Sequence, residues 1–183
     1  MIYHFSLPNT ALVTGILLCL LGAAGLIASG AARALVPAFP RHRLSGIVLL
    51  SLALIWSFWL LATMEMGEFA VFRRPFEIFL PIAFFLTIRF VDEFLAVRAL
   101  GILALLAAEP MLDAAFFRTE NSRLVLTVFA YLLIVLGLFW VTMPYLLRDQ
   151  IAFLRKTAPR WVAFVALVFV YGATLVTLAL TTY

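Results

Sequence analysis

The sequence predicts an all-α membrane protein, a polytopic bundle of transmembrane helices. Four stretches of the 183-residue chain, each at least 21 residues long, contain no Asp, Glu, Lys or Arg: 1–32, 44–64, 124–147 and 161–183. A helix of about 20 apolar residues spans the hydrocarbon core of a bilayer. The chain is also 66% hydrophobic with a mean hydropathy of +1.16, which leaves too little polar surface for a water-soluble fold.

The first two spans follow directly from these apolar runs. Asn9 and Thr10 are suitable N-cap residues for a helix over 9–32. No Lys or Arg precedes this run, and it is far longer than the apolar region of a secretory signal, so we expect an uncleaved span. A basic, proline-containing loop follows, and the second span covers 44–64.

The region 76–117 is harder to interpret because it is both apolar and charged. As one helix its 42 residues would be about 63 Å long, about twice the thickness of the bilayer core. The chain must therefore turn, and the charged segment Arg89–Arg98 is the expected place. We expect two short spans, 76–91 and 94–117. The alternative is one helix over 81–108 with its charges at mid-membrane, which gives five spans in all.

The last two spans are 124–147 and 161–182, separated by a basic loop. Tyr145 and Trp161 flank this loop, and aromatic residues favour the membrane interfaces. The six spans form a single transmembrane domain over residues 1–183.

The distribution of positive charge favours six spans over five. With six spans and the N-terminus outside, nine Lys and Arg residues lie in cytoplasmic loops and four lie outside, as the positive-inside rule requires. With five spans the two sides of the membrane carry five and six Lys and Arg residues, so the rule favours neither orientation. We therefore expect both termini on the non-cytoplasmic side, in a cytoplasmic (inner) membrane of bacterial type. The nine residues are Arg33, Arg41, Arg43, Arg89, Arg98, Arg148, Arg155, Lys156 and Arg160.

The strongest candidate site is the charged segment at the predicted turn. Of the 22 charged residues, 14 lie between Glu65 and Arg123. On a helix Arg89 would face Asp92 and Glu93, three and four positions on, while Arg98 would need another partner. Charges at membrane depth are expensive and suggest a proton or ion path. The alternative is a salt-bridged turn that fixes the topology.

A second candidate site is the carboxylate pair Glu109 and Asp113, four residues apart on one helical face. Pro110 leaves the carbonyl of Leu106 without its usual donor, and such breaks in membrane helices occur where water or another helix compensates. The pair could bind a cation or a substrate amine, or could simply contact water at the interface.

A third candidate is an acidic outer vestibule formed by Glu65, Glu68 and Glu77. Neighbouring methionines are weak evidence for copper, so we expect no metal site. His4 and His42 fall at opposite membrane faces and cannot ligate one haem. No cofactor is expected.

Small residues line one face of the first predicted helix. Small residues let another membrane helix approach closely. The face is therefore either an interface for a partner or second copy, or packing against the protein's own helices. It contains Gly15, Cys19, Gly22, Gly25 and Ser29.

The sequence contains no catalytic motif, so we do not expect an enzyme, although a lipid-modifying enzyme is a minor alternative. The net charge of +4 fits basic loops facing anionic lipid, not nucleic-acid binding. Two functions follow from the features above. The first is a structural or regulatory subunit of a membrane complex. The second is a proton or cation transporter or channel that uses the acidic residues of 65–120.

Overall fold

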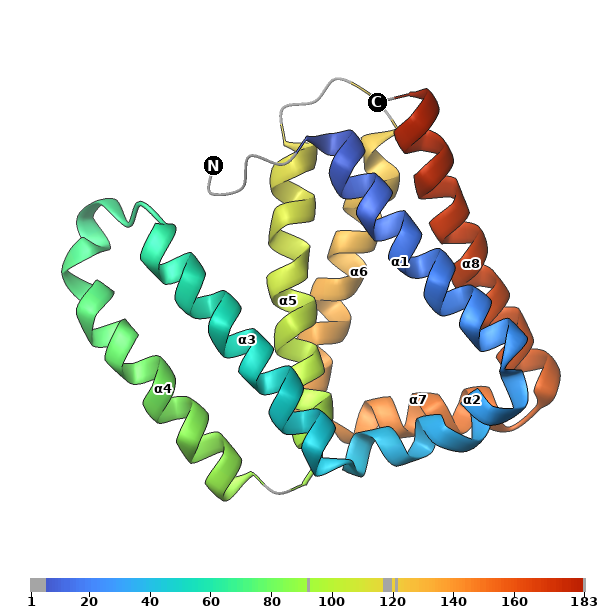
Figure 1. Cartoon of the computed structure of the whole chain (residues 1–183), viewed down its shortest axis with the longest axis horizontal. Coiled ribbons are helices and arrows are strands. Elements are labelled where there is room, and N and C mark those ends of the chain that lie inside the picture. The colour runs from blue at the N-terminus through green and yellow to red at the C-terminus, as the bar shows by residue number, and fades with distance from the viewer. Residues whose placement is uncertain (1–5, 92, 117–119, 121, 183) are drawn as a thin grey trace.

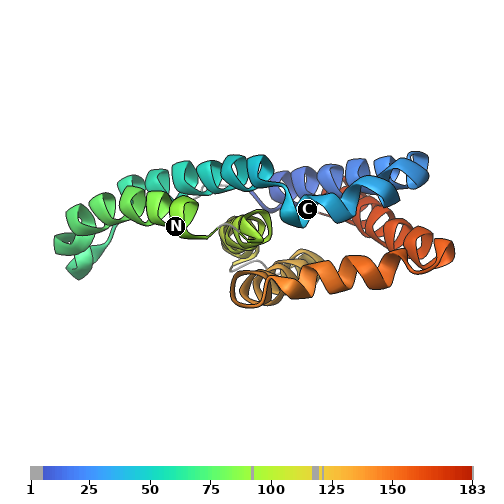
Figure 2. The same ribbon diagram turned by 90° about the horizontal axis from the view of Figure 1, so that it is seen from below.

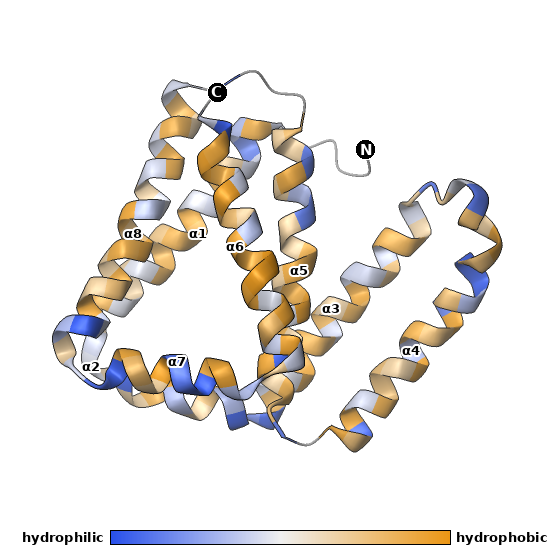
Figure 3. Cartoon of the chain, turned by 180° about the vertical axis from the view of Figure 1, so that it is seen from behind, coloured by the Kyte–Doolittle hydropathy of each residue, from blue (hydrophilic) through white to orange (hydrophobic). Residues whose placement is uncertain are grey.

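The computed structural model describes residues 6–91, 93–116, 120 and 122–182. In this part of the chain every regular element is a helix, which confirms the all-α prediction. Five helices are long and apolar enough to cross a membrane. They are α1 (Leu7–Ile27), α3 (Arg43–Thr63), α5 (Leu95–Ala115), α6 (Arg123–Thr142) and α8 (Ala158–Thr181), and their apolar character is visible in Figure 3.

The first and last of these helices, α1 and α8, form an antiparallel pair (Figure 1). They cross where Gly15 faces Gly172. A Cβ atom added to Gly172 would lie 2.8 Å from the carbonyl oxygen of Gly15 and 2.7 Å from the backbone nitrogen of Cys19. Lipid is as apolar as the helix surface, so close van der Waals packing of this kind is what holds membrane helices together.

A second antiparallel pair, α5 and α6, also packs through two facing glycines (Figure 1). A Cβ atom on Gly101 would lie 2.8 Å from the carbonyl oxygen of Gly137, and one on Gly137 would lie 2.9 Å from that of Gly101. Both helix pairs are therefore built on a reciprocal glycine contact.

The two pairs converge at one end of the molecule, which we call the apex (Figure 1). Buried leucine and alanine side chains from all four helices meet there. Tyr171 of α8 adds a hydrogen bond, because its hydroxyl donates to the carbonyl oxygen of Val125 of α6 at 2.7 Å. The apical cluster consists of Leu7, Ala11, Ala115, Leu126, Leu175 and Ala179.

Helix α3 forms a hairpin with α4 (Arg73–Phe90), joined by the 3₁₀ helix η2 (Gly67–Phe72). The hairpin stands out to one side of the four other long helices (Figure 1). Its link to them is the contact of α3 with α5, where a Cβ atom on Gly46 would lie 2.8 Å from the backbone nitrogen of Ala96. No residue of α4 is buried.

Two shorter helical segments cross the end opposite the apex, which we call the base. The first is α2 (Ser29–Leu35), which continues into the 3₁₀ helix η1 (Val36–Arg41), and the second is α7 (Tyr145–Arg155). They run side by side when seen from the base (Figure 2). Polar and apolar residues interleave along α7 in the pattern of a helix that lies in the membrane interface.

The segments at the base differ from the sequence prediction, which placed loops at 33–43 and 148–160. The predicted helix 9–32 ends at Ile27, because Ala28 has a non-helical backbone (φ −99°, ψ 33°) and α2 begins after it. The predicted helix 124–147 ends at Thr142. Pro144 has no N–H to donate to the preceding turn, so α6 stops and α7 starts in a new direction.

The chain does turn in the charged segment between the predicted spans 76–91 and 94–117. Helix α4 ends at Phe90 and α5 begins at Leu95. Phe94 precedes α5 with φ +57°, an uncommon conformation for a residue other than glycine. The alternative of a single helix over 81–108 is therefore wrong. Because α4 is not among the five apolar spans, a sixth crossing stays a prediction.

Candidate functional sites

The predicted ion-pair network at the α4–α5 turn is not formed by its described members. Arg89 and Glu93 are both exposed, and α4 ends between them, so the two side chains do not share a helix. Arg98 is half-buried at the start of α5, and its Nε has no hydrogen-bond partner. Asp92 lies outside the described residues.

The pair Glu109 and Asp113 lies in the apical half of α5 and faces α6. Glu109 is exposed, whereas the Oδ2 atom of Asp113 is buried and has no hydrogen-bond partner. A buried carboxylate oxygen without a donor is costly, and a cation would satisfy it. The two acids line a pocket of about 530 Å³ together with Leu105, Ala108, Leu112, Phe116 and Ile134.

The three acids of the predicted outer vestibule lie around the tip of the α3–α4 hairpin. Glu65 and Glu68 are exposed, and Glu77 is half-buried in the first turns of α4. Within the described part of the chain, no three His, Cys, Asp or Glu side chains gather closely enough to hold a metal ion. The tip is tied together instead by Arg73, which donates a hydrogen bond to the carbonyl oxygen of Met64.

The small-residue face of the first helix packs against the protein's own helix α8. Cβ atoms at Gly15, Gly22 and Gly25 would each meet atoms of α8 within 3 Å. The thiol of Cys19 donates to the carbonyl oxygen of Phe169 at 3.7 Å. Ser29 lies in α2, beyond the break at the end of α1. This face is therefore occupied within the chain.

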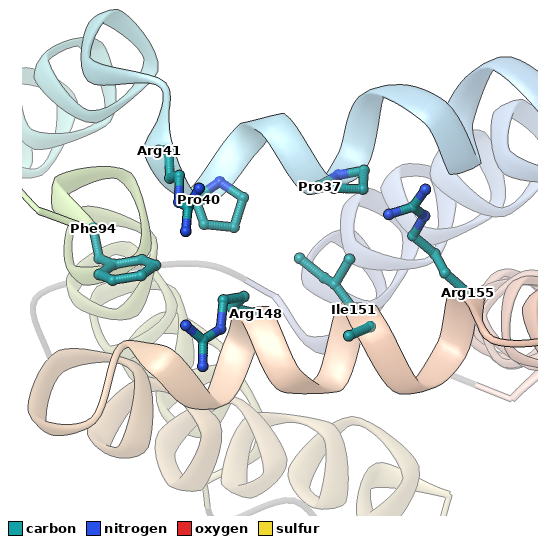
Figure 4. A pocket seen from close by; sticks show the side chains of 8 residues that line it. Pro37, Pro40, Arg41, Phe94, Arg148, Ile151 and Arg155 are labelled. Atoms are coloured by element: carbon teal, nitrogen blue, oxygen red, sulfur yellow. The ribbon is translucent and has the colours of Figure 1, made fainter.

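Sequence reasoning missed a pocket at the base, which lies between η1 and α7 (Figure 4). Its signal was two basic, proline-bounded segments more than 100 residues apart, but nothing in the sequence shows that they pack together. We call it the basal arginine pocket. It has a volume of about 260 Å³ and is lined by Pro37, Pro40, Arg41, Phe94, Arg148, Ile151, Ala152 and Arg155.

The basal arginine pocket carries excess positive charge. Arg41 and Arg155 form no ion pair with any described carboxylate, whereas Arg148 pairs with the neighbouring Asp149 at 2.9 Å. That pair is about half exposed on both sides, so water screens it. Glu93 lines an adjoining hollow of about 330 Å³ with Arg41, Phe94 and Arg148. The arrangement is suited to binding an anion.

The functional assignment depends on these sites alone. Comparison of the chain with protein-family models, with curated proteins and with solved structures finds no match.

Proposed function

We propose that this protein is a six-span, non-catalytic subunit of a membrane complex, and that its α3–α4 hairpin docks on another helical membrane protein. The observation that carries the proposal is α4, which has no buried residue and packs mainly along α3 and η2, with Phe84 and Ile88 near its end also touching the cluster between α3 and α5. A helix so weakly attached is free to pack against a partner.

The length of α4 supports a protein partner over lipid alone. Between Glu77 and Arg89 the helix has 11 uncharged residues, about 17 Å, against about 30 Å for the bilayer core. A span too short for the bilayer thins the membrane, extends its flanking charges to the interface or oligomerises. A partner helix beside α4 would shield those terminal charges and remove the mismatch.

The side chains of the hairpin also suit a protein interface. Its outer surface is rich in phenylalanine, and aromatic residues are enriched in the cores of interfaces. Its tip carries both signs of charge, which gives a partner specific groups to pair with. The exposed apolar residues of η2 and α4 are Phe69, Val71, Phe72, Phe76, Ile78, Phe79, Ile82, Phe85, Leu86 and Phe90.

The six-span topology, with α4 as the sixth crossing, draws support from the arrangement of the helices. Helix α1 begins and α8 ends at the apex, as an even number of crossings requires (Figure 1). The nine residues assigned to the cytoplasm all belong to the base or to helix ends beside it. The base then faces the cytoplasm, and both termini face the other side.

Replacing Ile78, Ile82 and Phe85 together with alanine is expected to release the partner. These exposed residues share one face of α4, and losing three apolar contacts at an interface lowers affinity at least about tenfold. The measurement is the intact mass, and the co-purified polypeptides, of particles extracted in mild detergent from the native membrane.

The matched control is the alanine triple at Val128, Leu132 and Val135 of α6, which are exposed at the same spacing. This control is expected to retain the partner. The proposal fails if the wild-type particle contains this chain alone, as a monomer or as a symmetric oligomer. It also fails if both triples release the partner equally.

A second candidate function is cation transport, favoured by the unpartnered Oδ2 of Asp113 in the pocket of about 530 Å³. Glu93 and Asp113 lie at opposite ends of α5, which is the most buried of the apolar spans. A path along this helix would therefore have a carboxylate at each end.

On the transport hypothesis, Asp113→Asn and Glu93→Gln are each expected to abolish proton or cation flux in liposomes while the yield of folded protein is unchanged. The amide keeps the size of the side chain and removes the charge that the cation needs. Glu68→Gln, at the exposed hairpin tip, is the control that should conduct normally. Flux that persists in both variants contradicts the hypothesis.

A further inference from the structure

We propose that the basal arginine pocket binds the headgroup phosphate of an anionic phospholipid. This site is separate from the hairpin, and the proposal does not depend on a partner protein. It depends on the charge of the pocket, on its apolar walls and on its level in the membrane.

The cations of the pocket come from two segments far apart in the sequence. Arg41 and Arg148 lie at one end of the pocket and Arg155 at the other (Figure 4). A guanidinium has five donors in a planar fork that fits two phosphate oxygens at once. Arg41 and Arg155 have no carboxylate partner among the described residues, so an external anion would balance the positive charge of their guanidinium groups.

Two of the described acids lie near the pocket, and they limit its positive charge but do not cancel it. Asp149 pairs with Arg148 but does not line the pocket, and Glu93 lines only the adjoining hollow. Among the residues that the structure describes, no carboxylate lines the pocket itself, and its charged side chains are all arginines. An anion inside it therefore lies among three arginine side chains, two at one end of the pocket and one at the other (Figure 4).

The walls between these cations are apolar. They are formed by Pro37, Pro40, Phe94 and Ile151, of which Pro40 and Ile151 are buried. A soluble phosphate has no apolar part that could pack against these walls. A lipid has one, because its glycerol backbone and first acyl carbons are attached to the phosphate. The volume of about 260 Å³ suits a headgroup better than a larger ligand.

The position of the pocket also favours a lipid. It lies at the ends of the apolar helices, between two segments that run across the base, which is the level of the headgroups. Basic pockets at the cytoplasmic ends of membrane helices are suited to anionic headgroups. In the proposed topology this is the cytoplasmic leaflet.

A hydrogen bond joins the segments that form the two walls of the pocket, and a second one fixes α7 in place. The guanidinium of Arg33 in α2 donates to the carbonyl oxygen of Arg155 in α7 at 3.0 Å. In the middle of α7, the indole of Trp140 in α6 donates to Oε1 of Gln150 at 3.2 Å, which fixes α7 against α6. The pocket is thus formed before the lipid arrives, which lowers the cost of binding.

The test is native mass spectrometry of the purified full chain, titrated in detergent with phosphatidylglycerol and separately with phosphatidylcholine. Wild type is expected to bind one phosphatidylglycerol in preference to phosphatidylcholine. Because each cation near an anionic headgroup contributes about fivefold to binding, Arg41→Gln with Arg148→Gln should weaken phosphatidylglycerol binding about 30-fold. Asp149→Asn, which frees Arg148, should strengthen it.

Lys156→Gln is the matched control, because it removes a cation from the same end of the molecule but outside the pocket. It is expected to change binding by less than about fivefold. The thermal unfolding temperature of each variant without lipid shows whether the fold is intact, and its rise on adding phosphatidylglycerol gives a second measure of binding. If the double variant matches wild type in both measures, or Lys156→Gln loses as much, the proposal is overturned.

Glycerol phosphate, which has the phosphate but no acyl chains, distinguishes a lipid from a soluble ligand. It is expected to displace bound phosphatidylglycerol only at far higher concentration. If glycerol phosphate binds wild type as tightly as phosphatidylglycerol does, and this binding is lost in the double variant, the pocket serves a soluble phosphate and the lipid assignment is overturned.

Discussion

Replacing Gly172 with alanine is expected to destabilise the protein more than the same change at any exposed glycine. The added methyl carbon would lie 2.7 Å from the backbone nitrogen of Cys19 and 2.8 Å from the carbonyl oxygen of Gly15. No side chain can rotate to relieve these contacts, so α8 must move away from α1. Overpacking of this kind costs about 1–3 kcal/mol, and leucine at the same position should cost more.

A graded series of glycine substitutions gives this prediction its controls. At Gly25 the three atoms nearest to the new methyl carbon all belong to the side chain of Val165 and none to the backbone, so a smaller loss is expected. At Gly30, in α2, no atom lies within 4 Å, and the gain in helix propensity should leave stability unchanged or slightly higher. Thermal unfolding in detergent measures the series. Equal unfolding temperatures for the three variants would contradict the packing described for α1 and α8.

The membrane-spanning helices were the predictable part of the fold. An uncharged apolar run must be helical in lipid, because each backbone N–H and C=O needs a partner within the segment. The runs over 44–64 and 161–182 therefore match α3 and α8 to within a few residues. The turn at Arg89–Arg98 was also predictable, since the length of 76–117 exceeds what one crossing accommodates.

The packing between helices was not predictable from one sequence. Small residues were recognised on the first helix, but Gly101, Gly137 and Gly172 are single glycines in apolar runs and show no pattern by themselves. Which helix faces which depends on contacts between residues far apart in the chain. The pairing of α1 with α8 is of this kind.

The candidate sites also differ in whether their residues are close together or far apart in the sequence, and only the first kind could be predicted. Glu109 and Asp113 lie four residues apart on one helix, so local geometry placed them on one face, and both line one pocket. The basal arginine pocket joins Arg41 to Arg148 across more than 100 residues, and helical periodicity carries no information about that contact. Proline and charge at 33–43 and 148–160 indicated loops, whereas both segments form helices that lie across the base.

The second large effect is expected at Gly46, where the hairpin joins the other helices. A leucine there would place its Cβ 2.8 Å from the backbone nitrogen of Ala96 and 3.0 Å from the side chain of Leu95. Helix α3 would have to leave α5, and α4 would go with it. The α1–α8 and α5–α6 pairs do not use this contact, so Gly46→Leu should separate the hairpin without unfolding the remainder.

Cysteine crosslinking can measure this separation. Leu50 and Ala99 belong to one buried cluster between α3 and α5, and Ala11 and Ala179 belong to the apical cluster. In a chain with Cys19 replaced by serine, Gly46→Leu should reduce crosslinking between cysteines at 50 and 99 at least about tenfold. Crosslinking between cysteines at 11 and 179 should be unchanged. Gly30→Leu, with open space around it, should affect neither pair.

Gly46→Leu also tests whether the hairpin binds a partner by itself or only when it is held against α5. If the hairpin docks a partner in the geometry that α3 and α5 impose, Gly46→Leu should release the partner although every residue of α4 is intact. A detached hairpin that still holds the partner would mean that α4 binds by itself and that the remaining helices serve another purpose. Loss of both crosslinks would contradict the independence of the hairpin, because the whole bundle would then depend on the contact at Gly46.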